Sequence, residues 1–229
     1  MSTPFDPQTP IAPPPPNTNP VNVPNALTLL RLIMVPVFGW MLLSHPYDFG
    51  WRFAAAGVFT VAMITDFLDG YLARKHNIVT TFGKIADPIA DKAMTGMAFI
   101  GLSIIGELLG IQPDSGPAGA AWWITIIILV REWGITLLRF LLVRRGVVVP
   151  ANKGGKLKMW VQAVALIASI LPIAEPFKWG AWILVLAALL ITVVTGVHYV
   201  ITMTATMRQQ KKVRAEFPPS NGPGPSPFG

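Results

Sequence analysis

The sequence predicts an all-α, polytopic membrane protein with six transmembrane helices and a short N-terminal interfacial helix. Of the 229 residues, 52% are hydrophobic and only 13% are charged, which is about half the charge of a typical soluble domain. Apolar stretches of about 20 residues, the length that crosses a bilayer, recur along the chain. Cysteine is absent, which excludes disulfides, thiolate metal ligands and cysteine nucleophiles.

Turn-forming segments separate the six predicted helices. The interfacial helix begins in "NVPNALTLLR", where Pro24 and Asn25 provide a helix start. The first span, 28–45, ends at "SHPYDFG", and the second, 52–74, ends at a basic loop. The third, 84–110, ends at "QPDSGPAG"; the fourth, 119–145, at "VVVPANKGG"; and the fifth, 154–174, at "LPIAEPFK". The sixth, 179–207, ends at a second basic segment.

Lysine and arginine lie mainly in the loops of one side. Twelve of them fall there or in the C-terminal segment, against two, Arg52 and Lys178, in the opposite loops. The positive-inside rule therefore places the basic side and both termini in the cytoplasm. We attribute the net charge of +7 to this topology and to contact with anionic membrane lipids, and expect no nucleic-acid partner.

A single membrane domain is expected over residues 22–207. The first 20 residues hold eight prolines and no basic residue, so they lack the features of a signal peptide. We expect residues 1–21 to form a disordered tail. Residues 208–229, which are basic at first and then rich in proline and glycine, are expected to form another.

Four aspartates lie between long apolar runs. Asp66 and Asp69 are three residues apart, so they share one helix face. Asp87 and Asp91 are four apart and share a face of the next helix. Two antiparallel helices joined by a short loop would bring all four carboxylates to a similar depth. Because buried carboxylates are costly and repel one another, we expect two divalent cations, Mg²⁺ or Mn²⁺, to balance them.

Salt bridges are the alternative way to neutralise these carboxylates. Arg74, Lys84 and Lys92 are near in sequence. These cations lie at the rim of the membrane, so we expect them to be poorly placed for the deeper Asp66 and Asp69. A metal site is the favoured interpretation.

The aspartates belong to a longer pattern with fixed spacing. It reads Asp66-x2-Asp69-Gly70-x2-Ala73-Arg74-x8-Gly83-x3-Asp87-x3-Asp91. This pattern resembles the signature of the CDP-alcohol phosphotransferases at every fixed position. The resemblance implies a six-helix membrane enzyme, expected to be a homodimer, in which an alcohol displaces CMP from a CDP-activated lipid. Gly83 is explained equally well by ordinary packing between helices.

The resemblance also implies roles for individual residues. The metal ligands would be Asp66, Asp69, Asp87 and Asp91, and Asp91 would also accept the proton of the attacking hydroxyl. The residues expected to contact CDP-diacylglycerol are Gly70, Ala73, Arg74 and Thr80 and, from a pattern near the N-terminus, Asn25 and Thr28.

Residues 131–162 are similar to the corresponding region of the bacterial phosphatidylglycerophosphate synthases within that family. The shared elements are Arg131-Glu132, Leu138-Arg139 and Gly155-Lys156-x-Lys158-Met159-x-x-Gln162, with Met159 in place of the family threonine. The resemblance predicts that four cations bind the phosphate of the acceptor: Arg131, Arg139, Lys156 and Lys158. Two alternatives stay open. Arg131 could form a structural ion pair with Glu132, and the lysines could set topology or contact lipid headgroups.

The predicted reaction transfers the phosphatidyl group of CDP-diacylglycerol to sn-glycerol 3-phosphate, giving phosphatidylglycerophosphate and CMP at the cytoplasmic face of a bacterial plasma membrane. The first alternative keeps this chemistry and changes the acceptor to inositol phosphate, inositol or serine. A divalent-cation transporter would also place aspartates within the membrane. Such a site is expected near the midplane, whereas this cluster lies beside the basic loops.

Overall fold

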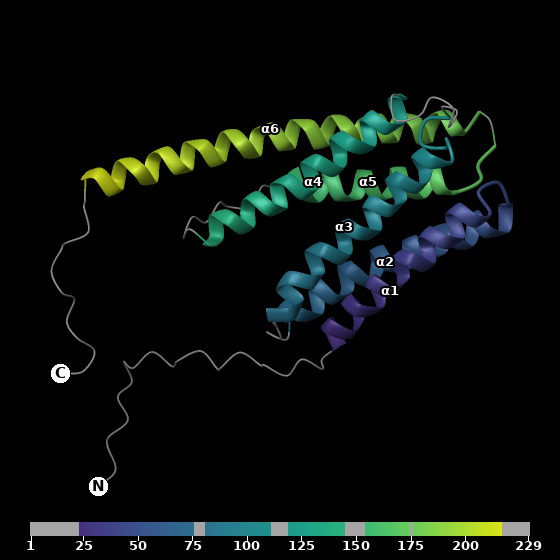
Figure 1. Ribbon diagram of the computed structural model, residues 1–229, viewed down its shortest axis with the longest axis horizontal. Coiled ribbons are helices and arrows are strands. Elements are labelled where there is room, and N and C mark those ends of the chain that lie inside the picture. The colour runs from purple at the N-terminus through teal and green to yellow at the C-terminus, as the bar shows by residue number, and fades with distance from the viewer. Residues whose placement is uncertain (1–22, 76–80, 111–118, 145–153, 175, 217–229) are drawn as a thin grey trace, which may run out of the picture.

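The structure is a computed structural model that describes residues 23–75, 81–110, 119–144, 154–174 and 176–216, and its regular elements over these ranges are all helices. They are α1 (Val23–Ser44), α2 (Phe49–Lys75), α3 (Thr81–Ile104), α4 (Ala120–Arg144), α5 (Gly154–Ile170) and α6 (Lys178–Glu216). The helices run back and forth along one long axis (Figure 1). The predicted all-α class is confirmed.

Several helices are built to lie in a membrane. Three segments are long and apolar enough to cross one: Asn25–Ser44 of α1, Phe49–Leu68 of α2 and Lys178–Arg208 of α6. A shorter apolar segment, Leu157–Ile170, forms most of α5. Large apolar side chains also face outward from the bundle, among them Leu137 and Leu190, which are 60% and 65% exposed. Lipid chains can cover such a surface, so the chain is a membrane protein.

The third helix, α3, occupies the centre of the bundle. It packs against α1, α2, α4 and α5, while α1 also packs on α2 and α5 on α6. The core contains Phe38, Phe59 and Phe99, one from each of the first three helices, all fully buried. At Gly101 of α3, an added Cβ would lie 2.7 Å from the Leu42 Cδ2 atom of α1. The missing side chain therefore allows α1 and α3 to approach closely.

A polar cluster, Arg52, Glu107 and Lys178, joins the helix ends at one end of the bundle. Arg52 donates to the carbonyl oxygens of Ser169 (2.6 Å) and Ile170 (2.9 Å), which close the last turn of α5. It also pairs with Glu107 at 3.3 Å, and Lys178 approaches the other oxygen of Glu107 at 3.5 Å. These bonds satisfy C-terminal carbonyls of α5 that no helical N–H can reach.

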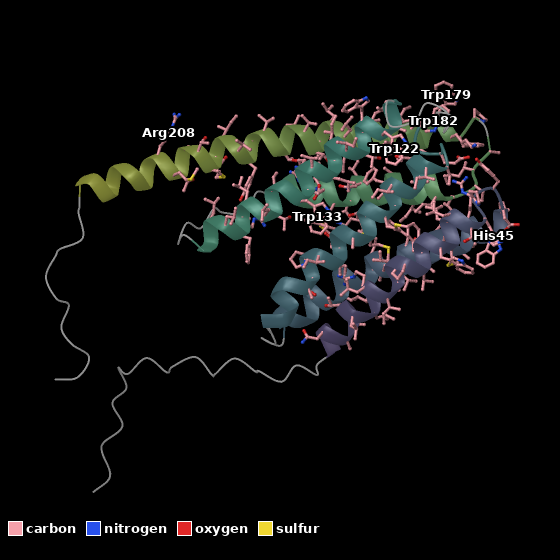
Figure 2. The ribbon with its side chains drawn as sticks, in the orientation of Figure 1. His45, Trp122, Trp133, Trp179, Trp182 and Arg208 are labelled. Carbon is pink, nitrogen blue, oxygen red and sulfur yellow. The ribbon has the colours of Figure 1, made fainter. Side chains whose placement is uncertain are left out.

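Aromatic side chains mark the same end. Figure 2 shows His45, Trp179 and Trp182 at the end of the bundle opposite Arg208. His45 stacks on Trp51, with ring centroids 4.6 Å apart, and Trp179 meets Trp182 edge-on at 4.8 Å. Tryptophan is enriched where a membrane protein crosses the interface between lipid and water, so this end of the bundle has the character of an interface.

The observed helix ends differ from the predicted ones in three places. The third helix ends at Ile104 rather than at residue 110, because Gly106 (φ 75°) and Gly110 (φ 63°) adopt the left-handed conformation that glycine tolerates. The fifth ends at Ile170 rather than 174, and the sixth continues to Glu216, into the segment assigned to the C-terminal tail. The first helix is continuous from Val23, so a separate interfacial helix is not confirmed. The N-terminal tail, 1–21, lies outside the described residues.

Candidate active site

Two of the four aspartates meet the same turn of α1. Arg31 donates from Nη1 to Asp66 Oδ1 on α2 at 2.6 Å. Thr28 donates from its hydroxyl to Asp87 Oδ1 on α3 in a short hydrogen bond. Thr28 and Arg31 are three residues apart and fully buried, so they lie on one face of α1. The carboxylates of α2 and α3 are therefore brought together at one level of the bundle, as their spacing predicts.

The Arg31–Asp66 ion pair corrects one step of the sequence argument. We expected no cation to reach the deeper aspartates, because the basic residues near them in sequence lie at the membrane rim. Arg31 comes instead from the preceding helix and is 1% exposed. An arginine inside an apolar span is itself a sign of a functional or paired site, and this sign was available in "NALTLLRLIM". The charge of Asp66 is thus already balanced in part by the protein.

Asp91 lies one turn after Asp87 on α3 and is partly buried. Its Oδ2 atom is 3.9 Å from the Nζ atom of Lys92. Thr95 donates to the backbone oxygen of Asp91 at 3.0 Å, as threonine commonly does one turn later in a helix. The Asp91 side chain therefore faces a cation from its own helix.

The same lysine links Asp91 to a second buried carboxylate, Glu132 of α4. Lys92 Nζ lies 3.5 Å from Glu132 Oε2. Glu132 Oε1 accepts from Lys158 of α5 in a short ion pair and from Arg131 Nη1 at 3.3 Å. We call Lys92, Arg131, Glu132 and Lys158 the cation cluster. Side chains from three helices thus converge on the Glu132 carboxylate, and Lys92 lies between this carboxylate and that of Asp91.

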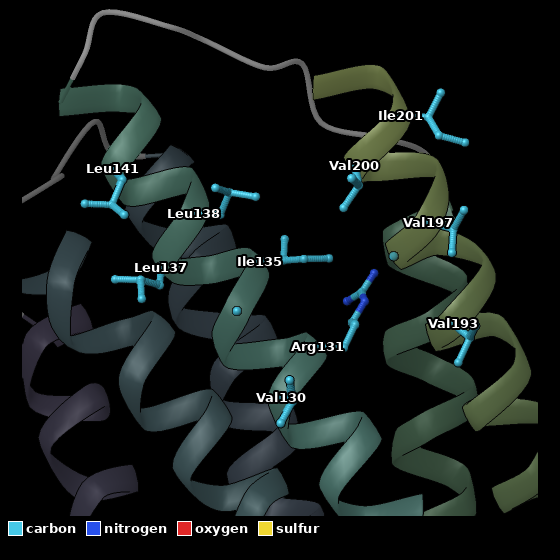
Figure 3. Close-up of a pocket in the computed structure, with 12 residues that line it drawn as sticks. Val130, Arg131, Ile135, Leu137, Leu138, Leu141, Val193, Val197, Val200 and Ile201 are labelled. Carbon is cyan, nitrogen blue, oxygen red and sulfur yellow. The ribbon is translucent and has the colours of Figure 1, made fainter. Parts of the chain in front are cut away.

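Arg131 also anchors α4 to α6. Its Nη2 atom donates to the Thr195 hydroxyl at 2.8 Å. An added Cβ on Gly196 would lie 3.2 Å from both Cγ and Nε of Arg131, so the glycine makes room for the arginine. Figure 3 shows Arg131 among the apolar side chains that line a groove of about 670 Å³ between α4 and α6.

Arg139 is placed differently from Arg131 and Lys158. It lies two turns further along α4, is exposed, and its guanidinium lies over the ring of Tyr199 on α6 at 5.6 Å from the centroid. The structure therefore brings Arg131 and Lys158 together and leaves Arg139 apart from them.

A second groove, of about 280 Å³, runs between α2 and α5. Its lining is mainly apolar. The lining residues of α2 are Thr60, Met63, Ile64 and Phe67, and those of α5 are Met159, Trp160, Ala163, Val164 and Ile167. Phe67 directly follows Asp66 in α2. The groove therefore reaches the helical turn of α2 that carries Asp66 and offers an apolar path along the bundle.

Comparison with known proteins decides the family. The model of the CDP-alcohol phosphatidyltransferase family matches residues 21–210, which is most of the chain. The chain belongs to the CDP-alcohol phosphatidyltransferase family. It is an enzyme of this phosphatidyltransferase class, and the family signature in the sequence is thereby confirmed.

Relatives of this phosphatidyltransferase carry more specific names. A Mycobacterium tuberculosis protein named "Probable phosphatidylglycerophosphate synthase" is 48% identical over 183 residues, covering 78% of this chain and 80% of the relative. A Bacillus subtilis CDP-diacylglycerol–glycerol-3-phosphate 3-phosphatidyltransferase is 37% identical over 196 residues, covering 78% and 93%. A Rickettsia typhi protein of the same name is 38% identical over 185 residues, covering 78% and 94%.

Some residues of the phosphatidyltransferase signature lie where the structure gives no side chain. Asp69, Gly70, Ala73 and Arg74 fall in the last turns of α2, and Lys156 in the first turn of α5, all with undescribed side chains. Thr80 lies outside the described residues, whereas Asn25 is buried near the start of α1. Among the described side chains, no three acidic or histidine residues gather closely enough to hold a metal ion. The remaining predicted ligand, Asp69, is not among those described side chains.

Two members of the cation cluster have contacts that the sequence does not predict. The sequence indicates Lys92 only as a cation at the membrane rim and Glu132 only as a partner for Arg131. Their roles depend on contacts across forty positions of the chain, between Lys92 and Glu132. The available signal was the burial expected of "REW" within an apolar span, because a glutamate there needs partners.

Proposed function

We propose that this enzyme transfers the phosphatidyl group of CDP-diacylglycerol to sn-glycerol 3-phosphate, releasing CMP and forming phosphatidylglycerophosphate. The observation that carries the proposal is the cation cluster beside Asp91. An acceptor with a phosphate needs cationic receptors close to the group that takes its proton. Lys92, Arg131 and Lys158 supply them, and the names of the relatives favour glycerol 3-phosphate over the other phosphorylated alcohols.

Asp66, Asp69, Asp87 and Asp91 are the proposed ligands of two divalent cations, Mg²⁺ or Mn²⁺. Carboxylate oxygens are the donors these hard cations prefer. The bonds from α1 reach Oδ1 of Asp66 and of Asp87, and an ionised carboxylate has about four acceptor sites, so each can accept more than one partner. When bound, the ions would neutralise charge on the diphosphate of the donor lipid.

The donor lipid is proposed to lie between α1 and α2. Asn25, Thr28, Gly70, Ala73, Arg74 and Thr80 are the proposed contacts for the CDP group. Arg74 can pair with phosphate as a fork of N–H donors. The apolar groove between α2 and α5 supports a path for one acyl chain, because its lining includes Phe67, which follows Asp66 in the same turn of α2.

Asp91 is the proposed general base. It accepts the proton of the acceptor hydroxyl as that oxygen attacks the phosphorus atom that bears the diacylglycerol. The new oxygen–phosphorus bond forms while the bond to the bridging oxygen breaks, and CMP leaves with that oxygen. General-base catalysis of this kind is worth about 10²–10⁴-fold in rate.

The membrane arrangement is part of the proposal. All six helices would cross the membrane, with the basic loops, both termini and the active site at the cytoplasmic face of a bacterial plasma membrane. The aromatic residues opposite Arg208 support a membrane interface at that end of the bundle (Figure 2). The family match over residues 21–210 supports one membrane domain close to the expected 22–207, whose last helix continues to Glu216. The resemblance also implies a homodimer. The mass of the protein in the purified protein–detergent complex tests this, because a dimer has twice the mass of one chain.

The test measures CMP released by purified protein in detergent with CDP-diacylglycerol and Mg²⁺ or Mn²⁺. Glycerol 3-phosphate, inositol phosphate, inositol and serine are supplied in separate reactions, with a reaction lacking any acceptor as the control for hydrolysis. We expect CMP and phosphatidylglycerophosphate only with glycerol 3-phosphate, and none after chelation by EDTA. Turnover with inositol phosphate alone would refute the acceptor, and full turnover in EDTA would refute the metals. Passage of Mg²⁺ into proteoliposomes without CMP release would favour a transporter.

A further inference from the structure

Glu132 pairs with three cations, Lys92, Arg131 and Lys158. It is buried within α4, and its two oxygens divide three cations between them. Oε1 accepts from Arg131 and Lys158, whereas Oε2 faces Lys92 at 3.5 Å. Because Lys92 and Lys158 bind different oxygens of this carboxylate, its geometry determines the distance between the two ammonium groups.

Without this carboxylate the three cations would repel one another. Glu132 is the only negative group of the cluster, and Asp91, outside it, lies 3.9 Å from Lys92. Cations that share one small carboxylate lie close together, and like charges at short range repel one another strongly in a low-dielectric site. Glu132 thus makes it possible for lysines of α3 and α5 and an arginine of α4 to occupy one small region.

The cation cluster lies next to the proposed general base, Asp91. Lys92 contacts both Glu132 and Asp91, so the cations lie next to the group proposed to receive the acceptor's proton. In a three-carbon acceptor such as glycerol 3-phosphate, the phosphate and the reacting hydroxyl are separated by only a few bonds. A phosphate held by these cations would leave the hydroxyl within reach of Asp91.

We infer that Glu132 is a positioning residue for the acceptor alcohol, which holds Lys92, Arg131 and Lys158 at the spacing that receives the acceptor's phosphate beside Asp91. This inference rests on the proposed function. It assigns to Glu132 an effect on one substrate alone: the acceptor should bind less well when the cations are displaced, and CDP-diacylglycerol should bind as before.

The chain contains a matched control. Glu107 is also a partly buried glutamate between cations, Arg52 and Lys178, but it lies in the polar cluster at the other end of the bundle. Glu107→Gln makes the same chemical change as Glu132→Gln. Both variants lose ion pairs between helices, so a purely structural role predicts similar effects for the two.

The experiment compares Glu132→Gln, Glu132→Asp and Glu107→Gln with the wild-type enzyme in detergent, varying each substrate in turn. We expect Glu132→Gln to raise the KM for glycerol 3-phosphate about tenfold or more, since small displacements of binding groups have large effects. The KM for CDP-diacylglycerol should stay within about twofold. Glu132→Asp keeps the charge and shortens the reach, so it should raise the same KM by a smaller factor. Glu107→Gln should change neither.

Several results would overturn the inference. One is an equal rise of both KM values in Glu132→Gln, and another is an unchanged KM for glycerol 3-phosphate in both Glu132 variants. If Glu132→Gln does not fold, Glu132→Asp decides. Thermal stabilisation by glycerol 3-phosphate, measured without the donor lipid, provides a readout that needs no turnover: equal stabilisation of wild type and Glu132 variants refutes the inference. A wild-type enzyme that releases no CMP with this acceptor would instead refute the proposed function.

Discussion

Replacing Arg31 with methionine tests whether a metal ion shares the neutralisation of Asp66. The Arg31 side chain is 1% exposed and Asp66 is 20% exposed, with 2.6 Å between Nη1 and Oδ1. Removing one partner of a buried ion pair costs about 3–5 kcal/mol. Because Asp66 retains some exposure, we expect the lower value, about 3 kcal/mol. For a protein of this size that corresponds to a melting temperature lower by about 6–12 °C in EDTA.

Divalent cations should reduce this loss if they bind beside Asp66. A ligand that binds only the folded state stabilises it, and a carboxylate without its arginine is a stronger ligand for a cation. We therefore expect the difference between Arg31→Met and wild type to be at least halved in Mg²⁺ or Mn²⁺. The assay is thermal unfolding in detergent, followed by the fluorescence of the eight tryptophans.

Arg52→Met is the matched control for this measurement. Arg52 is also buried and pairs with a carboxylate, Glu107, but it lies at the other end of the bundle. Its loss of stability should be the same in EDTA and in Mg²⁺. If the deficit of Arg31→Met were equally independent of metal, the proposed ion at Asp66 would be refuted. A deficit below about 1 °C in EDTA would show that the ion pair contributes little.

Three further substitutions have distinct expected outcomes. Asp91→Asn should lower kcat by about 10²–10⁴-fold while retaining Mn²⁺ binding by calorimetry; near-normal turnover would remove Asp91 from the role of base. Thr28→Val deletes the hydroxyl that donates to Asp87, so the KM for CDP-diacylglycerol should rise several-fold in steady-state assays, and an effect confined to the acceptor would contradict this placement. Gly110→Ala should lower stability by about 1–2 kcal/mol in thermal unfolding, because Gly110 has φ 63° and faces the Trp182 ring; unchanged stability would contradict the assigned backbone conformation.

The parts of the fold that depend on local sequence were predictable. The length of the apolar stretches predicted the helices, and the four-residue spacing of Asp87 and Asp91 predicted that they share one face of α3. The end of α3 was not predictable from hydrophobicity, since all the residues from 105 to 110 except Glu107 are apolar or glycine. The conformation of Gly106 ends the helix there, and glycine is compatible with either outcome.

The contacts of the site were harder to predict than its residues. The signature identifies the aspartates by spacing along two neighbouring helices, and the structure brings Asp66 and Asp87 to one turn of α1. Arg31 and Glu132 act through pairings that join helices distant in sequence. Spacing along the chain carries no information on which helix packs against which, so these partners required the three-dimensional arrangement.

The central helix α3 carries Asp87, Asp91 and Lys92 within less than two turns. In the proposed function these residues face the donor lipid and the acceptor, so the separation between the two proposed binding sites is set within one helix and not by the packing of neighbouring helices. Bilayers vary in thickness, and spanning segments tilt to match them. A tilt of α3 would move both proposed binding sites together, so we expect the alignment of the two substrates to tolerate membranes of different composition.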